Sequence, residues 1–266
     1  MVVAPSAFFR MVTRLSDIVK NVEELGIRIE VGDDFAEYRA RRLQQVGRGP
    51  IYPMFDAASS YVDHTNGFWI CGFNDAGDLI HTQAVRALDL SGISLVDHLR
   101  VHRHKYITPD SSPDPDRTMF FGPTGLSEVT GRVCYHGEFW LQAQGLGGPR
   151  SQGATALLSR LLLEIAVEVW SPSYVFAFVP KRLAAKGAHL RYGYPRCEPG
   201  QWIGPDKQVT DEDYLIWMDE TDLANLLDRE VLQPRVHTTA PSGVISSDAS
   251  DGPVVLVSSS DGSPAK

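Results

Sequence analysis

The sequence predicts a single α/β (α+β) domain in which helices flank a mixed, mostly antiparallel central sheet. Three observations support this fold class. The run IRIEV at residues 27–31 alternates like a strand and lies between two helical patterns. Two apolar runs at residues 68–73 and 79–87 are joined by NDAGD, whose Asn, Asp and Gly suit a tight hairpin between antiparallel strands. Helical and strand-like patterns then alternate to about residue 218.

The remaining elements follow from caps, periodicity and turn residues. Residues 8–25 predict a helix, and Asp33 or Asp34 is suited to cap a second helix that runs through residue 46. The stretch SSPDPDR predicts a proline-interrupted loop. The run RVCYHGEFWLQA predicts a long strand with a bulge at Gly137. Periodicity predicts three further helices and two further strands: helices at 94–105, about 153–169 and 181–192, and strands at 174–179 and 214–218.

We expect three segments along the chain. Residues 1–26 predict an N-terminal helical extension, residues 27–230 the main domain, and residues 231–266 a disordered tail rich in Ser, Pro and Asp. Because this tail has little apolar surface to bury, ending the chain near Pro234 should hardly change the melting temperature. A fall of several degrees would show instead that its VVLV run docks on the domain.

Composition and charge exclude several classes of protein. The 266 residues carry a formal net charge of -8 and no long run of Lys or Arg, which argues against a nucleic-acid partner. Cys71, Cys134 and Cys197 lack CxxC spacing, so we expect reduced thiols in a cytoplasmic protein. The N-terminal segment has no apolar run long enough for a signal peptide or a membrane span.

A histidine cluster invites a metal hypothesis. His98 and His102 share a helix face and His104 follows them, but no carboxylate or Cys at a fixed spacing completes a ligand set. A solvated helix end is therefore expected here, and the sequence predicts no metal site.

The glycine-rich stretch GLGGPRSQGAT at residues 145–155 has three interpretations. A dinucleotide-binding loop needs a third glycine where Arg150 stands, and the antiparallel strands upstream do not make the required βαβ unit. A nucleotide P-loop needs a Gly-Lys-Ser/Thr ending, which this stretch lacks. In the third interpretation, free N–H groups at a helix N-terminus face an anion and Gly153 lets the backbone approach it. A pyrophosphate fits this geometry.

These residues resemble the GNAT superfamily of acyl-CoA N-acyltransferases. Their signature, Arg/Gln-x-x-Gly-x-Gly/Ala between a strand and a helix, is matched by Arg150-x-x-Gly153, although Thr155 stands where Gly or Ala is usual. The order of elements agrees over about residues 27–220, and Tyr192-Gly193-Tyr194 looks like the Gly-Phe end of a family helix. The resemblance implies a GNAT-type sheet and transfer of an acyl group, acetyl or longer, from acyl-CoA to an amine by direct attack.

The resemblance also implies a donor site. Coenzyme A is expected as the co-substrate, without a metal, and the thioester carbonyl is expected in a gap beside the strand at 132–143, polarised by a backbone N–H. The residues expected to bind the donor are Leu141, Gln142, Arg150, Ser151, Gln152, Gly153, Ala154 and Thr155.

Three residues are candidates for proton transfer. Alternation places Glu138 and Trp140 on the opposite face from Phe139, and Glu138 is the candidate base, directly or through water, unless it is an ordinary exposed strand residue. His189 stands four residues before the glycine of the Gly-Phe-like ending, where the family usually places the tyrosine that protonates the CoA thiolate. It is the candidate acid unless its ring only packs, and Tyr192 is the next candidate.

Two other functions remain open from the sequence. The N-terminal helix, the long connection at 93–130 and the aromatic loop at 52–61 also look like N-acyl homoserine lactone synthases and N-acyl amino acid synthases, which use acyl carrier protein. A non-catalytic acyl-CoA-binding module is the alternative from another class. The expected partner is a small-molecule or peptide amine, and a homodimer stays open.

Overall fold

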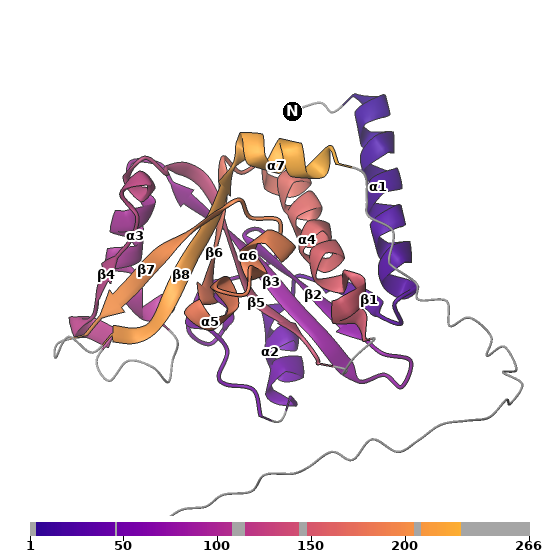
Figure 1. Ribbon diagram of the computed structural model, residues 1–266, viewed down its shortest axis with the longest axis horizontal. Coiled ribbons are helices and arrows are strands. Elements are labelled where there is room, and N and C mark those ends of the chain that lie inside the picture. The colour runs from indigo at the N-terminus through magenta and orange to yellow at the C-terminus, as the bar shows by residue number, and fades with distance from the viewer. Residues whose placement is uncertain (1–3, 46, 108–114, 144–147, 205–208, 230–266) are drawn as a thin grey trace, which may run out of the picture. The chain divides into compact units, whose positions relative to one another are not determined.

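The computed structural model describes residues 4–45, 47–107, 115–143, 148–204 and 209–229 (Figure 1). The predicted tail at 231–266 lies outside the described residues. The helices and short 3-10 turns are α1 (Pro5–Glu23), α2 (Phe35–Leu43), η1 (Pro53–Phe55), α3 (Leu95–Val101), η2 (Arg103–Lys105), η3 (Pro115–Arg117), η4 (Thr124–Ser127), η5 (Pro149–Gln152), α4 (Ala154–Trp170), α5 (Lys181–Ala184), α6 (Ala188–Arg191) and α7 (Glu220–Leu227). The strands are β1 (Arg28–Gly32), β2 (Gly67–Phe73), β3 (Leu79–Leu90), β4 (Met119–Phe121), β5 (Gly131–Leu141), β6 (Tyr174–Pro180), β7 (Arg196–Ile203) and β8 (Val209–Asp219).

The strands form one sheet in the order β1-β2-β3-β5-β6-β8-β7-β4. Strands β5 and β6 are parallel, and the other neighbours in this order pair antiparallel. The predicted mixed, mostly antiparallel sheet is therefore confirmed. The parallel pair lies at the centre of the order, and helix α4 connects its two strands.

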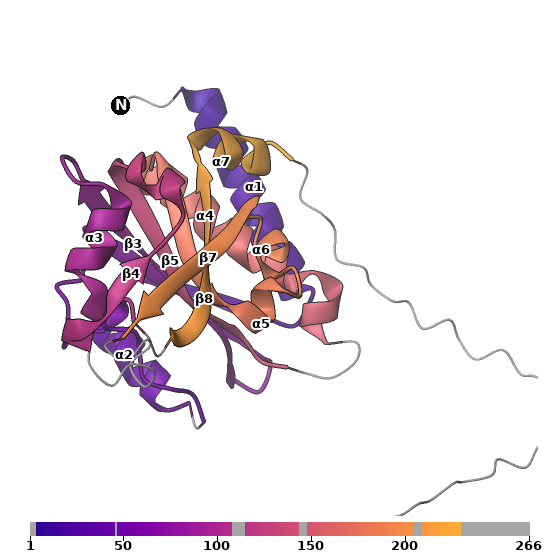
Figure 2. The ribbon, with the colours of Figure 1, turned by 60° about the vertical axis from the view of Figure 1, so that its left-hand side comes forward.

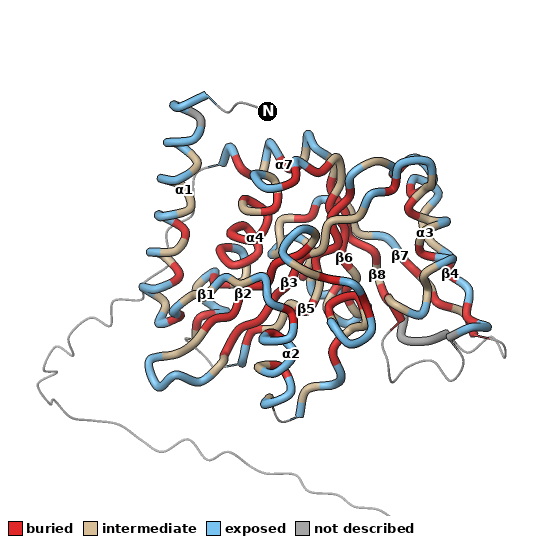
Figure 3. Tube along the Cα trace, turned by 180° about the vertical axis from the view of Figure 1, so that it is seen from behind, coloured by how far each residue is buried: buried red, intermediate tan, exposed pale blue. Residues whose placement is uncertain are grey.

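Helices cover both faces of the sheet, and each face has its own apolar core. On one face α1 and α4 pack together, and Ile18 and Val22 of α1 join the α4 leucines in a single buried cluster (Figures 1 and 3). On the other face Phe35 and Tyr38 of α2 lie in a second cluster with Leu95 of α3 (Figure 2). A ligand between β5 and β6 would therefore have the α1 and α4 layer on one side and the α2 and α3 layer on the other.

The predicted N-terminal extension is helix α1, and it packs along α4. Ile18 and Val22 are fully buried, and Arg14 Nε lies 3.2 Å from the buried carboxylate of Glu164. Asp34 caps α2 through the N–H groups of Ala36 and Glu37, as one of the two predicted caps. Within the described residues, no helix is long and apolar enough to cross a membrane.

Several segments differ from the sequence prediction. Strand β4 and helix α7 were not predicted. The helix predicted at 181–192 is split into α5 and α6, because Gly187 takes a left-handed conformation with φ of 68°. Strand β7 was not predicted, since it contains Pro199 and Gly200, which usually argue against a strand. The structure accommodates Pro199 because β4 pairs only with residues 201–203 of β7. At Pro199 the strand has a neighbour on one side only, so no hydrogen bond to β4 is lost because proline lacks an N–H.

Candidate active site

The central parallel strands separate partway along their length. Strands β5 and β6 pair at Val133 with Tyr174, at Cys134 with Val175 and at Tyr135 with Phe176. Past these positions β5 continues beside β3 alone and β6 beside β8 alone. Backbone groups on the facing edges of the two strands are therefore left open toward the gap between them.

A bulge in β5 lies beside this gap. Ala84 of β3 pairs with Gly137 and Thr82 with Trp140, so two residues of β5 stand opposite one residue of β3. Glu138 has a φ of 56°, one of the few left-handed residues other than glycine among those described. The bulge predicted at Gly137 is confirmed at this point. It turns the Glu138 side chain toward α2, while Phe139 faces Tyr192 on the α4 side.

A cavity of about 380 Å³ occupies the gap, within the size range of small-molecule sites. Much of its wall consists of aromatic rings from β5, β6 and the segment after α2, and of guanidinium groups from α2, α5 and that same segment. The lining residues are Arg42, Arg48, Gly49, Pro50, Tyr52, Tyr135, His136, Gly137, Glu138, Phe139, Ala177, Phe178, Val179, Pro180, Arg182, Leu183 and Tyr192.

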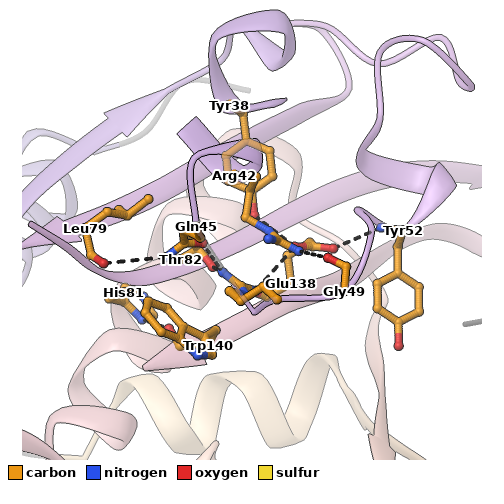
Figure 4. A network of polar contacts seen from close by, with 11 residues as sticks. Tyr38, Arg42, Gln45, Gly49, Tyr52, Leu79, His81, Thr82, Glu138 and Trp140 are labelled. Atoms are coloured by element: carbon orange, nitrogen blue, oxygen red, sulfur yellow. Dashed lines mark hydrogen bonds and ion pairs between the residues drawn. The ribbon is translucent and has the colours of Figure 1, made fainter. Parts of the chain in front are cut away.

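Glu138 is held by a buried polar network (Figure 4). Its Oε2 lies 2.6 Å from Nε of Arg42 and 3.6 Å from Nη2 of Arg48, and the hydroxyl of Tyr38 donates to it at 3.4 Å. Its Oε1 accepts from the backbone N–H of Tyr52 at 3.0 Å. The side chain is 1% exposed, so this is not an ordinary exposed strand residue. A base role for Glu138 stays a prediction, and the contacts already occupy both carboxylate oxygens.

Arg48 is the less compensated of the two guanidinium groups beside Glu138. Its Nη1 donates to Gln45 at 2.6 Å and to the Thr82 hydroxyl at 2.8 Å, both of them neutral acceptors. Its guanidinium also stacks over Trp140, 4.8 Å from the ring centre. Burial, followed by repulsion from Arg42, lowers the pKa of Arg48 to about 10. The positive charge of Arg48 is therefore only partly neutralised by Glu138, and a second anion beside it would be stabilised.

The glycine-rich segment leads directly into α4. Gly153 is left-handed with φ of 93°, its N–H donates to the Pro149 carbonyl, and the helix begins at Ala154. A Cβ at Gly153 would meet nothing within 4 Å, because the position is open and exposed. Arg150 and Ser151 are exposed beside it. The predicted donor-binding residues from Arg150 to Thr155 thus span the end of η5 and the start of the 17-residue helix α4, where Ala154 is buried and Gly153 is exposed.

Tyr192 belongs to the cavity wall. Its ring lies 4.7 Å from that of Phe139, and the Ser159 hydroxyl of α4 donates to its backbone carbonyl at 2.8 Å. Burial raises the pKa of Tyr192, while the positive charges of Arg191 and Arg150 oppose the shift, so its hydroxyl keeps its proton at neutral pH. Among the described residues His189 does not line the cavity, and its buried Nδ1 has no hydrogen-bond partner.

A buried chain of hydrogen bonds fixes another wall residue, His136. The Tyr194 hydroxyl lies 3.0 Å from its Nδ1, and its Nε2 lies 3.2 Å from Oε1 of Gln83, whose Nε2 donates to the Leu158 carbonyl. The amide of Gln83 therefore makes Nε2 the protonated nitrogen. Burial lowers the pKa of His136 to about 3, so the ring is neutral and adds no charge to the cavity.

The other predicted residues lie away from the cavity. Leu141 is buried in the core beside α4, and Gln142 is exposed, with its N–H donating to the Ile80 carbonyl. His98 hydrogen-bonds the Tyr106 hydroxyl at 2.8 Å, and its ring lies 4.6 Å from that of His102 in a tilted arrangement. The described residues contain no group of three or more His, Cys, Asp or Glu side chains that is arranged to hold a metal ion.

The arginines of the site are not predicted from the sequence. Arg42 is 4% exposed although it lies in the basic run RARR, a pattern that is typical of a solvent-exposed helix face. Arg48 and Tyr52 follow in a Gly- and Pro-rich segment without periodicity. A glutamate at the predicted bulge was the one available signal, because a buried carboxylate requires a cationic partner.

The fold and the site define an α/β protein with a substrate-sized cavity between two separating parallel strands. No protein-family model matches the chain, and no curated protein matches it. Among solved structures, similarity is found to an N-acyl amino acid synthase from uncultured soil microbes, at 12% identity and a TM-score of 0.34 over 85% of this chain and 90% of that one.

Two further solved structures are acetyltransferases. An aminoglycoside acetyltransferase in complex with coenzyme A and kanamycin has 12% identity and a TM-score of 0.37, covering 75% of this chain and 98% of that one. A mutant spermidine N-acetyltransferase from Vibrio cholerae has 8% identity and a TM-score of 0.41, covering 75% and 97%.

Proposed function

We propose that this protein is an N-acyltransferase that moves an acyl group from acyl-CoA to an amine by direct attack. The observation that carries the proposal is the separation of β5 and β6 after Tyr135 and Phe176, with a cavity in the gap. Open backbone N–H groups at such a strand edge are suited to polarise a thioester carbonyl, because they add positive potential without a side chain. The chain then leads from β5 to an accessible helix N-terminus at Gly153, suited to a pyrophosphate.

The chemical step requires two proton movements. The neutral amine attacks the thioester carbon, a C–N bond forms, and the C–S bond breaks with its electron pair going to sulfur. The amine nitrogen releases one proton to water or to a base, and the CoA thiolate takes up one proton. Tyr192 is placed on the cavity wall with a protonated hydroxyl and is suited to supply the second of these.

Turnover tests this function against a binding module. Purified protein is mixed with acetyl-, octanoyl- and palmitoyl-CoA in turn, with a panel of amines, and free thiol is followed with DTNB. We expect amine-dependent thiol release with at least one chain length. Tight acyl-CoA binding in calorimetry without release from any pair would favour the non-catalytic module, and release only from acyl carrier protein would favour the synthase-like alternative.

The donor site has its own test at Gly153. Gly153→Asp should lower CoA affinity well over tenfold, because it adds a carboxylate where phosphates are expected to bind. Gly153→Ala is the matched control, since it introduces the same left-handed strain at φ 93° without the charge. Affinity is measured by calorimetry and folding by circular dichroism. Equal affinities for the two folded variants would overturn the site assignment.

A further inference from the structure

The cavity wall carries more positively than negatively charged side chains. Three guanidinium groups, those of Arg42, Arg48 and Arg182, line the cavity, and Glu138 supplies the single carboxylate among the lining residues. The wall therefore has two positive charges in excess, since the His136 ring is neutral. A polyamine or another polycation is repelled by such a wall, whereas an anionic group is attracted to it.

The excess charge is located at Arg48 more than at Arg42. Arg42 and Glu138 form a close pair at 2.6 Å, and both side chains are less than 5% exposed. Arg48 is 15% exposed and lies 3.6 Å from the same carboxylate. Its Nη1 donates hydrogen bonds to the neutral acceptors Gln45 and Thr82. A guanidinium that is mostly buried, held in place and incompletely neutralised is suited to bind a carboxylate.

Arg48 lies on the opposite side of the sheet from the expected CoA pyrophosphate. It contacts Thr82, Trp140 and Glu138, the residues of β3 and β5 that face α2. The accessible N-terminus of α4, with Arg150, belongs to the other layer. The anion that Arg48 would bind is therefore part of the acceptor and not a phosphate of the donor.

We propose that the acceptor is an amine that also carries a carboxylate, such as a free amino acid, and that Arg48 is the residue that binds this carboxylate. This inference rests on the proposed acyltransferase function. The same positive charges would favour the reactive neutral form of the acceptor, because a nearby cation lowers the pKa of an ammonium group. Binding of the acceptor and loss of its proton would then be coupled at one site, and no dedicated base would be required.

The experiment compares acceptors that differ only in the carboxylate. Thiol release from the best acyl-CoA is measured with a set of amino acids, with their primary amides, and with spermidine. The amide has a less basic amine and keeps the size of the acid, so it would be the better acceptor if the carboxylate were not recognised. We expect kcat/KM for the best amino acid to exceed that for its amide by about 10- to 100-fold.

Two variants locate the recognition. Arg48→Gln should raise KM for the amino acid by about 10- to 100-fold and should raise KM for the amide far less. Arg48→Lys should give a KM for the amino acid between those of the parent and Arg48→Gln. The matched control is Arg39→Gln, which removes a 44%-exposed arginine of α2 that pairs with Asp56 outside the cavity. It should leave the preference for the acid intact.

The outcomes separate this inference from the function on which it rests. Thiol release with amides or spermidine equal to that with amino acids overturns the carboxylate site and leaves the acyltransferase standing. A preference for amino acids that Arg48→Gln does not change overturns the role of Arg48. No thiol release with any amine overturns the proposed function itself, and calorimetry with amino acids then still reports whether the folded protein binds them through Arg48.

Discussion

Tyr192→Phe should lower kcat by about 10² to 10⁴-fold while the KM values for donor and acceptor change little. The substitution removes one hydroxyl from the cavity wall and keeps the ring that packs on Phe139. Loss of a general acid slows the step in which the thiolate leaves, without weakening ground-state binding. The measurement is steady-state thiol release, corrected for the folded fraction of each variant.

His189→Gln is the matched comparison for this prediction. If His189 were the donor, its substitution would give the large loss in kcat and Tyr192→Phe a small one. Burial raises the pKa of Tyr192 above its ordinary value of about 10, so a tyrosine donor stays protonated and gives no falling limb below that pH. A large loss of kcat in His189→Gln together with a small loss in Tyr192→Phe would contradict the assignment to Tyr192.

Glu138→Gln should reduce the free energy of unfolding by about 3–5 kcal/mol, because it leaves two buried guanidinium groups beside a neutral amide. Arg42 would lose its 2.6 Å partner, and Arg48 would lose the carboxylate with which it pairs at 3.6 Å. Arg42→Gln should cost less, since Glu138 would keep Arg48 and the Tyr52 N–H. Urea unfolding followed by circular dichroism measures all of these variants.

The control is Glu37→Gln on α2, which removes a 47%-exposed carboxylate that pairs with Arg41. It should change stability by less than about 0.5 kcal/mol. A similarly small change in Glu138→Gln would show that the ion pair is not structural. If that variant also lost turnover while staying fully folded, the base role predicted from the sequence would regain support.

Much of the architecture is determined by local sequence. The NDAGD turn and the alternation around it predict the β2–β3 hairpin, and the cap at Asp34 predicts the start of α2. The leucine periodicity gave α4, and the Arg150-x-x-Gly153 spacing marked the segment that leads into it. These features were predictable because each depends on neighbours within a few residues along the chain.

Tertiary structure alone decided the chemistry of the cavity. Glu138 was predictable as a candidate, but its partners Arg42 and Arg48 lie about ninety residues away in a run that looks solvent-exposed. Whether such charges are solvated or buried depends on which strands α2 covers and on the bulge that turns Glu138 toward it. Likewise, the family resemblance favoured His189 by its position four residues before Gly193, whereas only the folded chain shows that Tyr192 lines the cavity. Backbone periodicity is a local property, but burial and charge pairing arise only when distant segments pack together.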